Sequence, residues 1–411
     1  MGWCRMMPSD REAAGRRIAR ARRRRGLSQA VLAGLVGRSE SWLSQVERGR
    51  RGVDSYSVLV RLAEVLRVDI EKLAGSSDHD ETGRRAYPAA SLIEQAMMGY
   101  GTPGPLDDGD GPGREDSLDF LRAQARSAYQ AYQATRYDAA GRILPGLIRG
   151  AETAARTTGP ASPAPCAVRA RVYDTAAALL SRVGEPFLAW AAADRALFAA
   201  GQSGDPLLAA ASAWRMSYMI TGRKHPQEAL ELAMAAAAAL GSATRTLSSE
   251  WLSVYGALHL AAATAAAAVF DRATTESLLA TARGIADRTG EANHMGTAFG
   301  PVNVAIHAIS ASLRLGDPRT AAQTGEALDL AAMPAGLVGR RTQVNLDLAC
   351  AYAMTRKDAA AVNLLLAAER LSPQLVRYDP ATRDVLTELL RREHRPSTPE
   401  LRPLARRAGV I

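Results

Sequence analysis

Four polar side chains at helical spacing form a surface that can hydrogen-bond the edges of nucleic-acid bases. They are Glu40, Ser41, Ser44 and Gln45. Leu43 and Val46 fall on the opposite side of the same helix and are expected to point inward. Ser39 can cap its N-terminus, and Gly49 ends it. Because a helix of this width fits the major groove of B-DNA, the segment is expected to read DNA bases.

A second short helix is expected immediately before this one. Ser28 precedes the apolar run of Val31, Leu32 and Leu35, so its hydroxyl can cap free backbone N–H groups there. Gly37 then interrupts the helical pattern, as a tight turn between two helices requires. Residues 26–52 therefore predict a helix-turn-helix, which makes double-stranded DNA the first partner to consider.

Arginines surround this motif. The run Arg22 to Arg25 ends the preceding helix, and Arg48, Arg50 and Arg51 follow the base-reading helix. Residues 1–75 hold 16 Arg or Lys against 8 Asp or Glu, so +8 of the total charge of +9 lies there. This distribution suits contact with phosphates. Arginines at a helix C-terminus also suit the helix dipole, and the scarcity of lysine indicates a general bias toward arginine.

Residues 11–75 resemble the Cro/C1-type helix-turn-helix family, also called the XRE family. The landmarks are Leu27-Ser28-Gln29, Leu32-Ala33, Val36-Gly37, the run Ser44 to Gly49, Leu62-Ala63, Leu66 and Leu73. The resemblance implies a five-helix DNA-binding domain in which Gln29 contacts the DNA backbone or a base. It also implies that Glu47 pairs with Arg22, so both are expected to be structural. The complete expected DNA-contacting set is Gln29, Arg38, Ser39, Glu40, Ser41, Ser44, Gln45, Arg48, Arg50 and Arg51.

Glu40 departs from the family pattern, in which a neutral amide often stands. A carboxylate near phosphates is costly unless it accepts a hydrogen bond from a base, such as from the N4 amino group of cytosine. Alternatively, Glu40 only benefits from its place in the first turn of the helix, where the dipole favours an acid. The sequence leaves both interpretations open.

The rest of the chain has the pattern of an all-helical array. Alanine-rich amphipathic helices are expected in pairs at 115–157, 165–203, 205–241, 246–289, 296–331 and 337–372, with a capping helix at 380–392. In one stretch, small and bulky residues have the spacing of a tetratricopeptide repeat: Leu348, Ala349, Tyr352, Ala361, Leu365, Ala368 and Pro373. The sequence thus predicts an all-α protein. Its expected parts are the DNA-binding domain (11–75), a linker (76–114) with one candidate helix near 91–98, a TPR-like α-solenoid (115–395) and a tail (396–411).

The first helix of each pair is expected to line a concave groove. Polar and aromatic side chains on these helices, mostly four residues apart, are candidates for contacting a peptide or small molecule: Tyr173, Trp214, Tyr218, Tyr255, His259, Asn303, His307 and Asn345. Aromatic residues at this spacing are also typical of packing between repeats. Trp190 and Trp251 are expected to be core residues.

The whole layout resembles bacterial regulators that join a Cro/C1-type domain to a tetratricopeptide-like sensor, a group that includes peptide-pheromone receptors. The resemblance implies that asparagines on the groove helices hold the backbone of the ligand, a role that Asn303 and Asn345 suit. The expected function is a transcriptional regulator that binds its operator as a homodimer and senses a peptide or small molecule. The alternative is a DNA-bound scaffold whose repeats bind a protein partner.

Other classes of protein are disfavoured. The six histidines lack HExxH spacing, and neither a glycine-rich phosphate loop nor a GxSxG elbow occurs, so no enzyme, cofactor or metal site is expected. Cys4, Cys166 and Cys350 are odd in number and widely spaced, which fits a reducing cytoplasm. The alanine run at 258–269 is too short to span a bilayer, and residues 1–8 lack the apolar region of a signal peptide. A cytoplasmic protein without a membrane partner is therefore expected.

Overall fold

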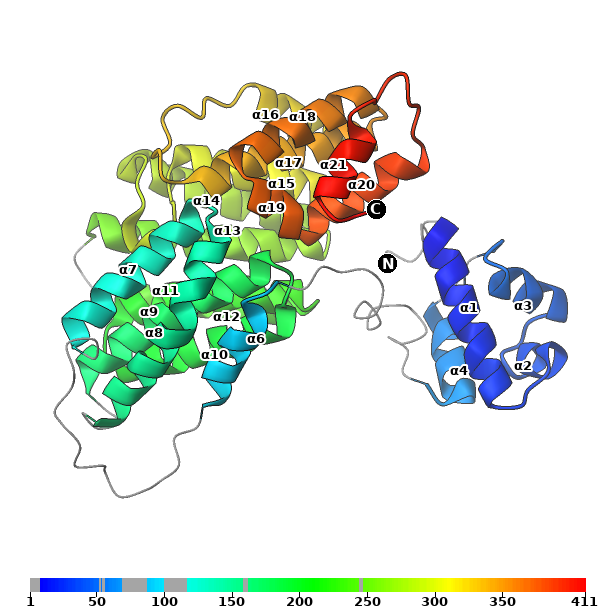
Figure 1. Ribbon diagram of the computed structural model, residues 1–411, viewed down its shortest axis with the longest axis horizontal. Coiled ribbons are helices and arrows are strands. Elements are labelled where there is room, and N and C mark those ends of the chain that lie inside the picture. Colours follow the sequence, from blue (N-terminus) through cyan, green and yellow to red (C-terminus); the bar gives the residue numbers. More distant parts are fainter. Residues whose placement is uncertain are drawn as a thin grey trace. The chain divides into compact units, whose positions relative to one another are not determined.

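The computed structural model describes residues 8–51, 53, 56–68, 87–99, 117–157, 162–243 and 247–411. All regular secondary structure in these ranges is helical, as the sequence predicts (Figure 1). The chain forms two compact units, which divide between Arg84 and Arg85. The fold is thus a small N-terminal helical unit and a larger array of helices.

The N-terminal unit contains α1 (Pro8–Arg24), α2 (Gln29–Leu35), α3 (Glu40–Glu47) and α4 (Tyr56–Leu66). Ser28 caps α2 and Ser39 caps α3, as predicted, because each hydroxyl accepts a hydrogen bond from a backbone N–H three residues later at 3.2 Å. Gly37, between the two helices, has a φ of +68°, a conformation that favours glycine. The expected fifth helix, with Leu73, lies outside the described residues.

The core of the N-terminal unit collects apolar side chains from all four helices. Its members are Ile18, Leu32, Ala33, Val36, Trp42, Leu43, Val46, Val53, Val58, Leu62, Ala63 and Leu66. Leu43 and Val46 point inward as predicted. Gly15 allows α1 to approach α3 closely, since a Cβ at this position would lie 2.3 Å from the carbonyl oxygen of Val46. The sequence did not reveal this contact.

The second unit is a stack of antiparallel helix pairs (Figure 1). The pairs are α7 (Leu118–Gln133) with α8 (Tyr137–Thr157), α9 (Pro163–Arg182) with α10 (Pro186–Gln202), α11 (Pro206–Gly222) with α12 (Pro226–Ala243), α13 (Ser249–Ala268) with α14 (Arg272–Thr289), α15 (Pro301–Arg314) with α16 (Pro318–Glu326), and α17 (Val338–Met354) with α18 (Asp358–Leu371). Each predicted pair corresponds to one of these. The predicted helical-repeat architecture is therefore confirmed.

The turns inside these pairs share one backbone feature, a residue with positive φ followed by a hydrogen bond back to the first helix. In the turn from α11 to α12, Lys224 has a φ of +68°, and the next N–H, of His225, donates to the carbonyl oxygen of Ile220 at 3.2 Å. The turn from α17 to α18 repeats it, with Arg356 at +64° and Lys357 bonded to Tyr352 at 2.9 Å. Such a left-handed residue satisfies the last carbonyls of the first helix and reverses the chain.

Two segments differ from the expected boundaries. The helix α6 (Ala90–Met98) lies inside the expected linker, yet it buries Ile93 and Met97 in the core of the second unit. Just before it, the buried Tyr87 hydroxyl donates to the carbonyl oxygen of Tyr137 at 2.6 Å. The candidate helix near 91–98 therefore exists, and residues 87–99 are not linker.

The C-terminal end also differs from expectation. After α19 (Pro373–Tyr378) and the capping helix α20 (Pro380–Arg391), which was predicted, a further helix α21 (Leu401–Arg407) falls within the expected tail. Leu401, Leu404 and Ala405 of α21 are buried. These residues close the end of the array, so they are part of its core.

Two tryptophans were expected in the core, and only one is there. Trp251 is buried, and its indole N–H donates to the carbonyl oxygen of Leu240 at 3.3 Å. Trp190 is 39% exposed, and the guanidinium carbon of Arg223 lies 5.7 Å from its ring centre. The expectation for Trp190 was wrong because its ring lies at the surface, beside Arg223 at the end of α11.

Among the described residues, one helix is long and apolar enough to cross a membrane by length and composition. It is α13, which extends nine residues upstream of the alanine run that the sequence analysis judged too short. Within the array, 78% of its apolar window is buried against other helices. The apolar character of α13 is thus accounted for by its central place in the core.

Candidate DNA-binding surface and ligand cavity

Three helices of the N-terminal unit meet at one buried carboxylate. Glu47, at the end of α3, accepts hydrogen bonds from Arg22 of α1 at 2.6 and 2.9 Å. The amide nitrogen of Gln29, at the start of α2, donates to the same carboxylate at 2.7 Å. Arg22 also donates to the carbonyl oxygen of Leu27 at 2.8 Å. The Arg22–Glu47 pair was predicted, and it fixes the angle between α3 and the rest of the unit.

The electrostatics of this cluster favour the ionised pair. Burial alone raises the pKa of Glu47, but hydrogen bonds from Arg22 and Gln29 outweigh it, so the pKa lies below its ordinary value. The hydrogen bond that Arg22 donates to Glu47 raises the pKa of Arg22. The side-chain amide of Gln29, which the sequence predicts to contact DNA, is held against Glu47, and its contact with DNA stays a prediction.

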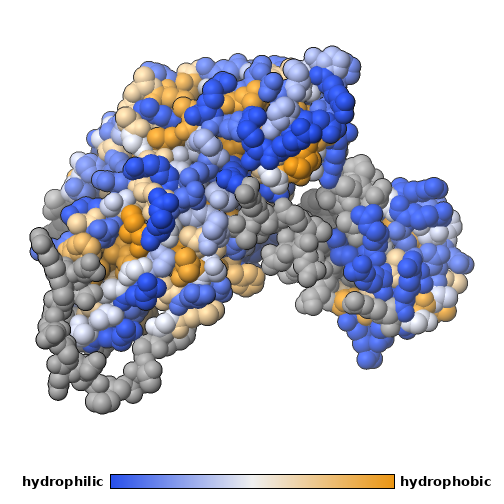
Figure 2. All heavy atoms as spheres, in the orientation of Figure 1, coloured by the Kyte–Doolittle hydropathy of each residue, from blue (hydrophilic) through white to orange (hydrophobic). Residues whose placement is uncertain are grey.

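The polar face of α3 is presented to solvent. Glu40 and Ser41 are exposed, and Ser44 and Gln45 are half-buried. In Figure 2, hydrophilic residues cover most of the visible face of the N-terminal unit. The side chain of Arg48 bends back along the helix, where it donates to the Ser44 hydroxyl at 2.7 Å.

The remaining residues of the expected DNA-contacting set lie around the ends of α3. The Arg38 guanidinium carbon lies 5.7 Å from the ring centre of Trp42, beside the capping residue Ser39. Beyond the other end, Arg50 and Arg51 are exposed, and their backbone N–H groups donate to the carbonyl oxygen of Gln45 at 2.9 and 3.2 Å. The polar face and the flanking arginines therefore form one continuous candidate surface.

The eight residues expected to bind a ligand do not form one site. Tyr173 is buried, and its hydroxyl donates to Glu152 at 2.7 Å. Tyr255 stacks between Trp251 and His259, with ring centres 4.6 Å apart in each case. Asn345 is half-buried on α17. Tyr173 therefore bonds a residue of the preceding helix, and Tyr255 packs against side chains of its own helix.

A second group of the expected residues lies closer together. The hydroxyl of Tyr218 is 3.5 Å from Nε2 of His307, whose pKa burial lowers well below its ordinary value. Tyr218 also packs edge-on against Trp214, with ring centres 5.9 Å apart. Asn303, one turn before His307, is buried, and its side-chain oxygen has no hydrogen-bond partner. Of the eight residues, Trp214 lines a substantial cavity.

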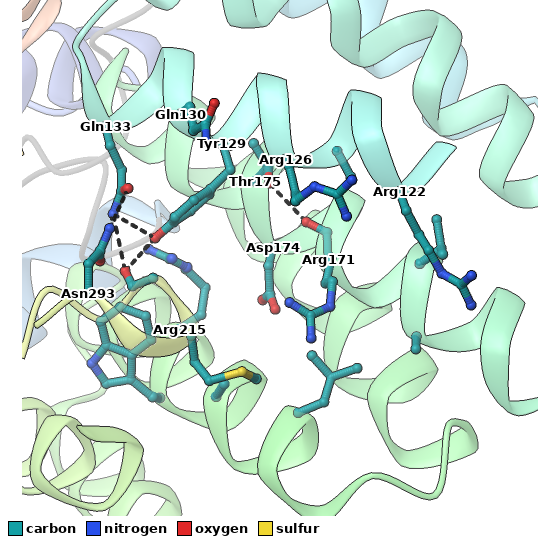
Figure 3. A pocket seen from close by; sticks show the side chains of 18 residues that line it. Arg122, Arg126, Tyr129, Gln130, Gln133, Arg171, Asp174, Thr175, Arg215 and Asn293 are labelled. Atoms are coloured by element: carbon teal, nitrogen blue, oxygen red, sulfur yellow. Dashed lines mark hydrogen bonds between the residues drawn. The ribbon is translucent and has the colours of Figure 1, made fainter. Parts of the chain in front are cut away.

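That cavity has a volume of about 580 Å³ and lies between α7, α9, α11 and the short helix η2 (His294–Gly296). Its charged lining residues are Arg122, Arg126, Arg171, Asp174 and Arg215. Figure 3 shows the side chains of Arg126, Asp174 and Arg215 extending into it from three different helices. These residues were not predicted from the sequence, because the predicted ligand-binding set was chosen for its aromatic side chains and for histidine and asparagine. The pairs Arg122 with Arg126 and Tyr129 with Gln133 have the same four-residue spacing and were a usable signal.

Charges at the floor of the cavity are incompletely paired. Arg215 is 9% exposed, its guanidinium carbon lies 4.6 Å from the ring centre of Trp214, and its Nε has no hydrogen-bond partner. One oxygen of Asp174 accepts from the Ser212 hydroxyl at 2.8 Å, and the other has no partner. Burial raises the pKa of Asp174 to about 6, despite the opposing effect of Arg215.

A smaller chamber of about 40 Å³ adjoins the cavity and shares Tyr129, Trp214 and Arg215 with it. Arg182 and Arg340 also line this chamber. Burial, reinforced by the like charge of Arg182, lowers the pKa of Arg340. The positive charge of the cavity therefore continues into the interior of the array.

Residues 13–74 match the sequence family described as a helix-turn-helix domain. The match spans α2, α3 and α4 with both serine caps and the Arg22–Glu47 pair. The N-terminal unit is a helix-turn-helix DNA-binding domain. The protein as a whole is a helix-turn-helix protein that carries a helical-repeat domain after its DNA-binding domain.

Two solved structures resemble the chain distantly. One is BtubC (BKLC) from P. vanneervenii, with 14% identity, a TM-score of 0.36, and coverage of 63% of this chain and 94% of that one. The other is PlcR of Bacillus thuringiensis in complex with the peptide PapR7 and DNA, with 13% identity, a TM-score of 0.30, and coverage of 67% and 95%. No curated protein sequence matches the chain significantly.

Proposed function

We propose that the protein is a transcriptional regulator that inserts α3 into the major groove of its operator. The observation that carries this proposal is the exposed polar face of α3. The Arg22–Glu47 ion pair, whose side chains are not part of that face, holds the helix in place. Glu40, Ser41, Ser44 and Gln45 read base edges. Arg38, Arg48, Arg50 and Arg51 contact phosphates on either side, where they supply affinity without sequence preference. Ser39 holds the N-terminus of α3 near the backbone.

The regulator binds DNA as a homodimer and acts in the cytoplasm. A single helix-turn-helix unit buries little surface on DNA, and two-fold symmetric half-sites supply the specificity that one unit lacks. The repeat domain binds an effector, either a peptide or a small molecule, and this binding changes the geometry or the population of the DNA-binding dimer. A protein of this kind acts by binding, so we assign it no catalytic step.

Two substitutions test the assignment of α3. Operator fragments are first selected from random duplexes with the full-length protein. Gln45→Ala is expected to relax base preference at one position by about tenfold or more, since a good base contact contributes about 1–3 kcal/mol of discrimination. Arg50→Ala is expected to weaken binding to all duplexes and to reduce the salt-dependence slope by about one. Unchanged base preference in Gln45→Ala would show that another face of α3 reads DNA.

A second candidate function is a DNA-bound scaffold whose repeats bind a protein partner. It is supported by two exposed aromatic side chains on α10, Phe187 and Phe198, which are 71% and 66% exposed. A double variant with alanine at both positions distinguishes the two functions when transcription of a reporter gene under the operator is measured in a reporter strain. Loss of regulation with intact operator affinity favours the scaffold, and retained regulation favours the effector-binding regulator.

A further inference from the structure

The cavity between α7, α9 and α11 carries an excess of positive charge. Of its five charged lining residues, four are arginines and one is Asp174. Arg122 pairs at 2.9 Å with Asp119, an exposed residue of α7 that does not line the cavity. The interior chamber beyond Tyr129 adds Arg182 and Arg340. A molecule bound here would therefore meet guanidinium groups both at the mouth of the cavity and at the inner end of the cavity.

Arg215 is the most informative of these residues because it is nine-tenths buried and incompletely bonded. Burying a guanidinium is costly unless its donors find partners, and buried arginines are normally paired with carboxylates. Asp174 lines the same cavity, but its bonded oxygen is engaged by Ser212, and its other oxygen has no partner. Nε of Arg215 and the second carboxylate oxygen of Asp174 are thus both buried without a hydrogen-bond partner in the wall of a cavity large enough for a ligand.

The other walls suit an organic molecule of modest size. Trp214 and Tyr129 contribute aromatic surface, and Ala167, Val168 and Leu208 contribute apolar surface. The volume of about 580 Å³ falls in the range of about 300–1,000 Å³ typical of ligand sites.

Hydrogen bonds between α7 and the segment around Gly296 close one end of the cavity. The Tyr129 hydroxyl donates to the carbonyl oxygen of Gly296 at 2.5 Å, and Gln133 and Asn293 bond each other at 2.8 Å (Figure 3). At Gly296, which has a φ of +73°, a Cβ would lie 2.5 Å from the Tyr129 ring. The segment around Gly296 is thus seated directly on the aromatic wall, which defines the shape of the cavity.

We propose that this cavity binds an anionic ligand, a carboxylate- or phosphate-bearing molecule of metabolite or short-peptide size, with Arg215 as the principal anion contact. Arg126 and Arg171 attract the anion at the mouth, and Trp214 and Tyr129 contact its less polar part. This inference rests on the proposed effector-sensing function and names the chemical class of the effector. A guanidinium can bind either anion in a bidentate manner, so the test must distinguish the two.

Thermal unfolding of the full-length protein tests the proposal with defined probes. The probes are inorganic pyrophosphate and succinate, each compared with sodium chloride at equal ionic strength. At concentrations well above the dissociation constant, the specific anion is expected to raise the Tm by several degrees. Whichever probe gives the larger shift identifies the acidic group that the cavity prefers.

Three variants assign the shift to the cavity. Arg215→Gln is expected to weaken anion binding by about tenfold or more, because a charge-assisted hydrogen bond is lost. Arg171→Gln serves as a second cavity variant that does not endanger folding, since its side chain is exposed. Arg149→Gln is the matched control, because Arg149 is an exposed arginine on α8 that does not line the cavity. It is expected to retain the full shift.

Two outcomes overturn the proposal. One is a Tm that neither anion raises beyond the chloride control. The other is a rise that is equal in Arg171→Gln, Arg215→Gln and Arg149→Gln, which would place the anion on other arginines, such as those of the DNA-binding domain. Operator affinity, measured with and without the anion, tests the sensing function separately. If the cavity variants abolish anion binding but the anion does not change operator affinity, the anion site is supported and the sensing role is refuted.

Discussion

The two units of this protein bury charge in opposite ways. In the DNA-binding domain, Glu47 is held by both Arg22 and Gln29, and every contact is within 2.9 Å. In the repeat domain, Arg215 and Asp174 line one cavity, and each keeps a buried polar atom without a hydrogen-bond partner. The first arrangement joins helices together. The second leaves two buried polar atoms unpaired beside a cavity.

This difference distinguishes a structural charge from a candidate functional one. A charge that is fully hydrogen-bonded inside a domain has no capacity left for a ligand, and removing its partner damages the fold. A buried charge with free donors is tolerated where an adjoining space admits water or a ligand. We therefore expect substitutions of Glu47 and of Arg215 to act on different properties: folding for the first and ligand binding for the second.

The largest expected effect follows from breaking the paired charge. Glu47→Ala leaves Arg22 buried without its partner, which typically costs about 3–5 kcal/mol. A unit of about 60 residues has a total stability of only about 3–9 kcal/mol, so we expect the DNA-binding domain to unfold and operator binding to be lost. Gel-shift assays and urea unfolding, followed by circular dichroism, measure both consequences.

Two further variants test whether pairing is the cause. Replacing both partners, as Arg22→Met with Glu47→Leu, removes the unpaired charge and is expected to restore much of the lost stability. Arg215→Gln is expected to leave operator binding and helix content near those of the unmodified protein. A loss of folding in Arg215→Gln as severe as that in Glu47→Ala would remove the distinction between the two units.

The next effect concerns pH, and its sign differs between the units. The pKa of Glu47 is lowered on folding, so the stability it contributes is present above pH 4.5 and is lost as pH falls through the folded value. Burial raises the pKa of Asp347, on α17, from 3.8 to about 6. Its contribution is therefore complete below pH 3.8 and is lost as pH rises to about 6, by at most about 3 kcal/mol.

Hydrogen exchange, corrected for the intrinsic rate at each pH, measures each unit separately. Between pH 4 and 6, we expect protection in the repeat domain to fall and protection in the DNA-binding domain to rise. Asp347→Asn is expected to flatten the trend of the repeat domain, because its amide oxygen still accepts from Gln343 and the Ser310 hydroxyl can reverse its role. An undiminished slope in this variant would assign the pH dependence to other groups, with Asp174 the first to test.

Local signals explain what the sequence predicted well. The caps Ser28 and Ser39 act within three residues, and the turns inside helix pairs are set by a few neighbouring residues, so the helices and their pairing follow from short segments. The Arg22–Glu47 pair joins distant residues. It came from the family resemblance and not from spacing.

Long-range packing explains what the sequence did not reveal. The helix α6 is fixed to the repeat domain partly through Tyr87, whose bonding partner Tyr137 lies 50 residues away. The cavity requires α7, α9, α11 and Gly296 to converge, and no local pattern around Arg215 indicates that meeting. The buried Arg215, on the alanine-rich helix α11, is therefore a residue whose role helical periodicity did not predict.

The smallest expected effect concerns how tightly each unit is packed. At Gly15, a Cβ would contact the carbonyl oxygen of Val46, which cannot move without shifting α3. At Gly150, on α8, a Cβ would instead lie 2.9 Å from the end of the Leu121 side chain, which can rotate. We expect Gly15→Ala to destabilise the DNA-binding domain by about 1–3 kcal/mol, and Gly150→Ala to change the repeat domain by less than that.

Gly34 is the matched control within the DNA-binding domain, because a Cβ there on α2 meets no other atom within 4 Å. Gly34→Ala is expected to stabilise α2 by up to about 1 kcal/mol, since alanine has the higher helix propensity. Urea unfolding of the three variants gives these differences, and operator affinity should fall only in Gly15→Ala. Equal losses for Gly15→Ala and Gly150→Ala would mean that the two units are equally intolerant of added volume, so that only the pairing of their buried charges distinguishes them.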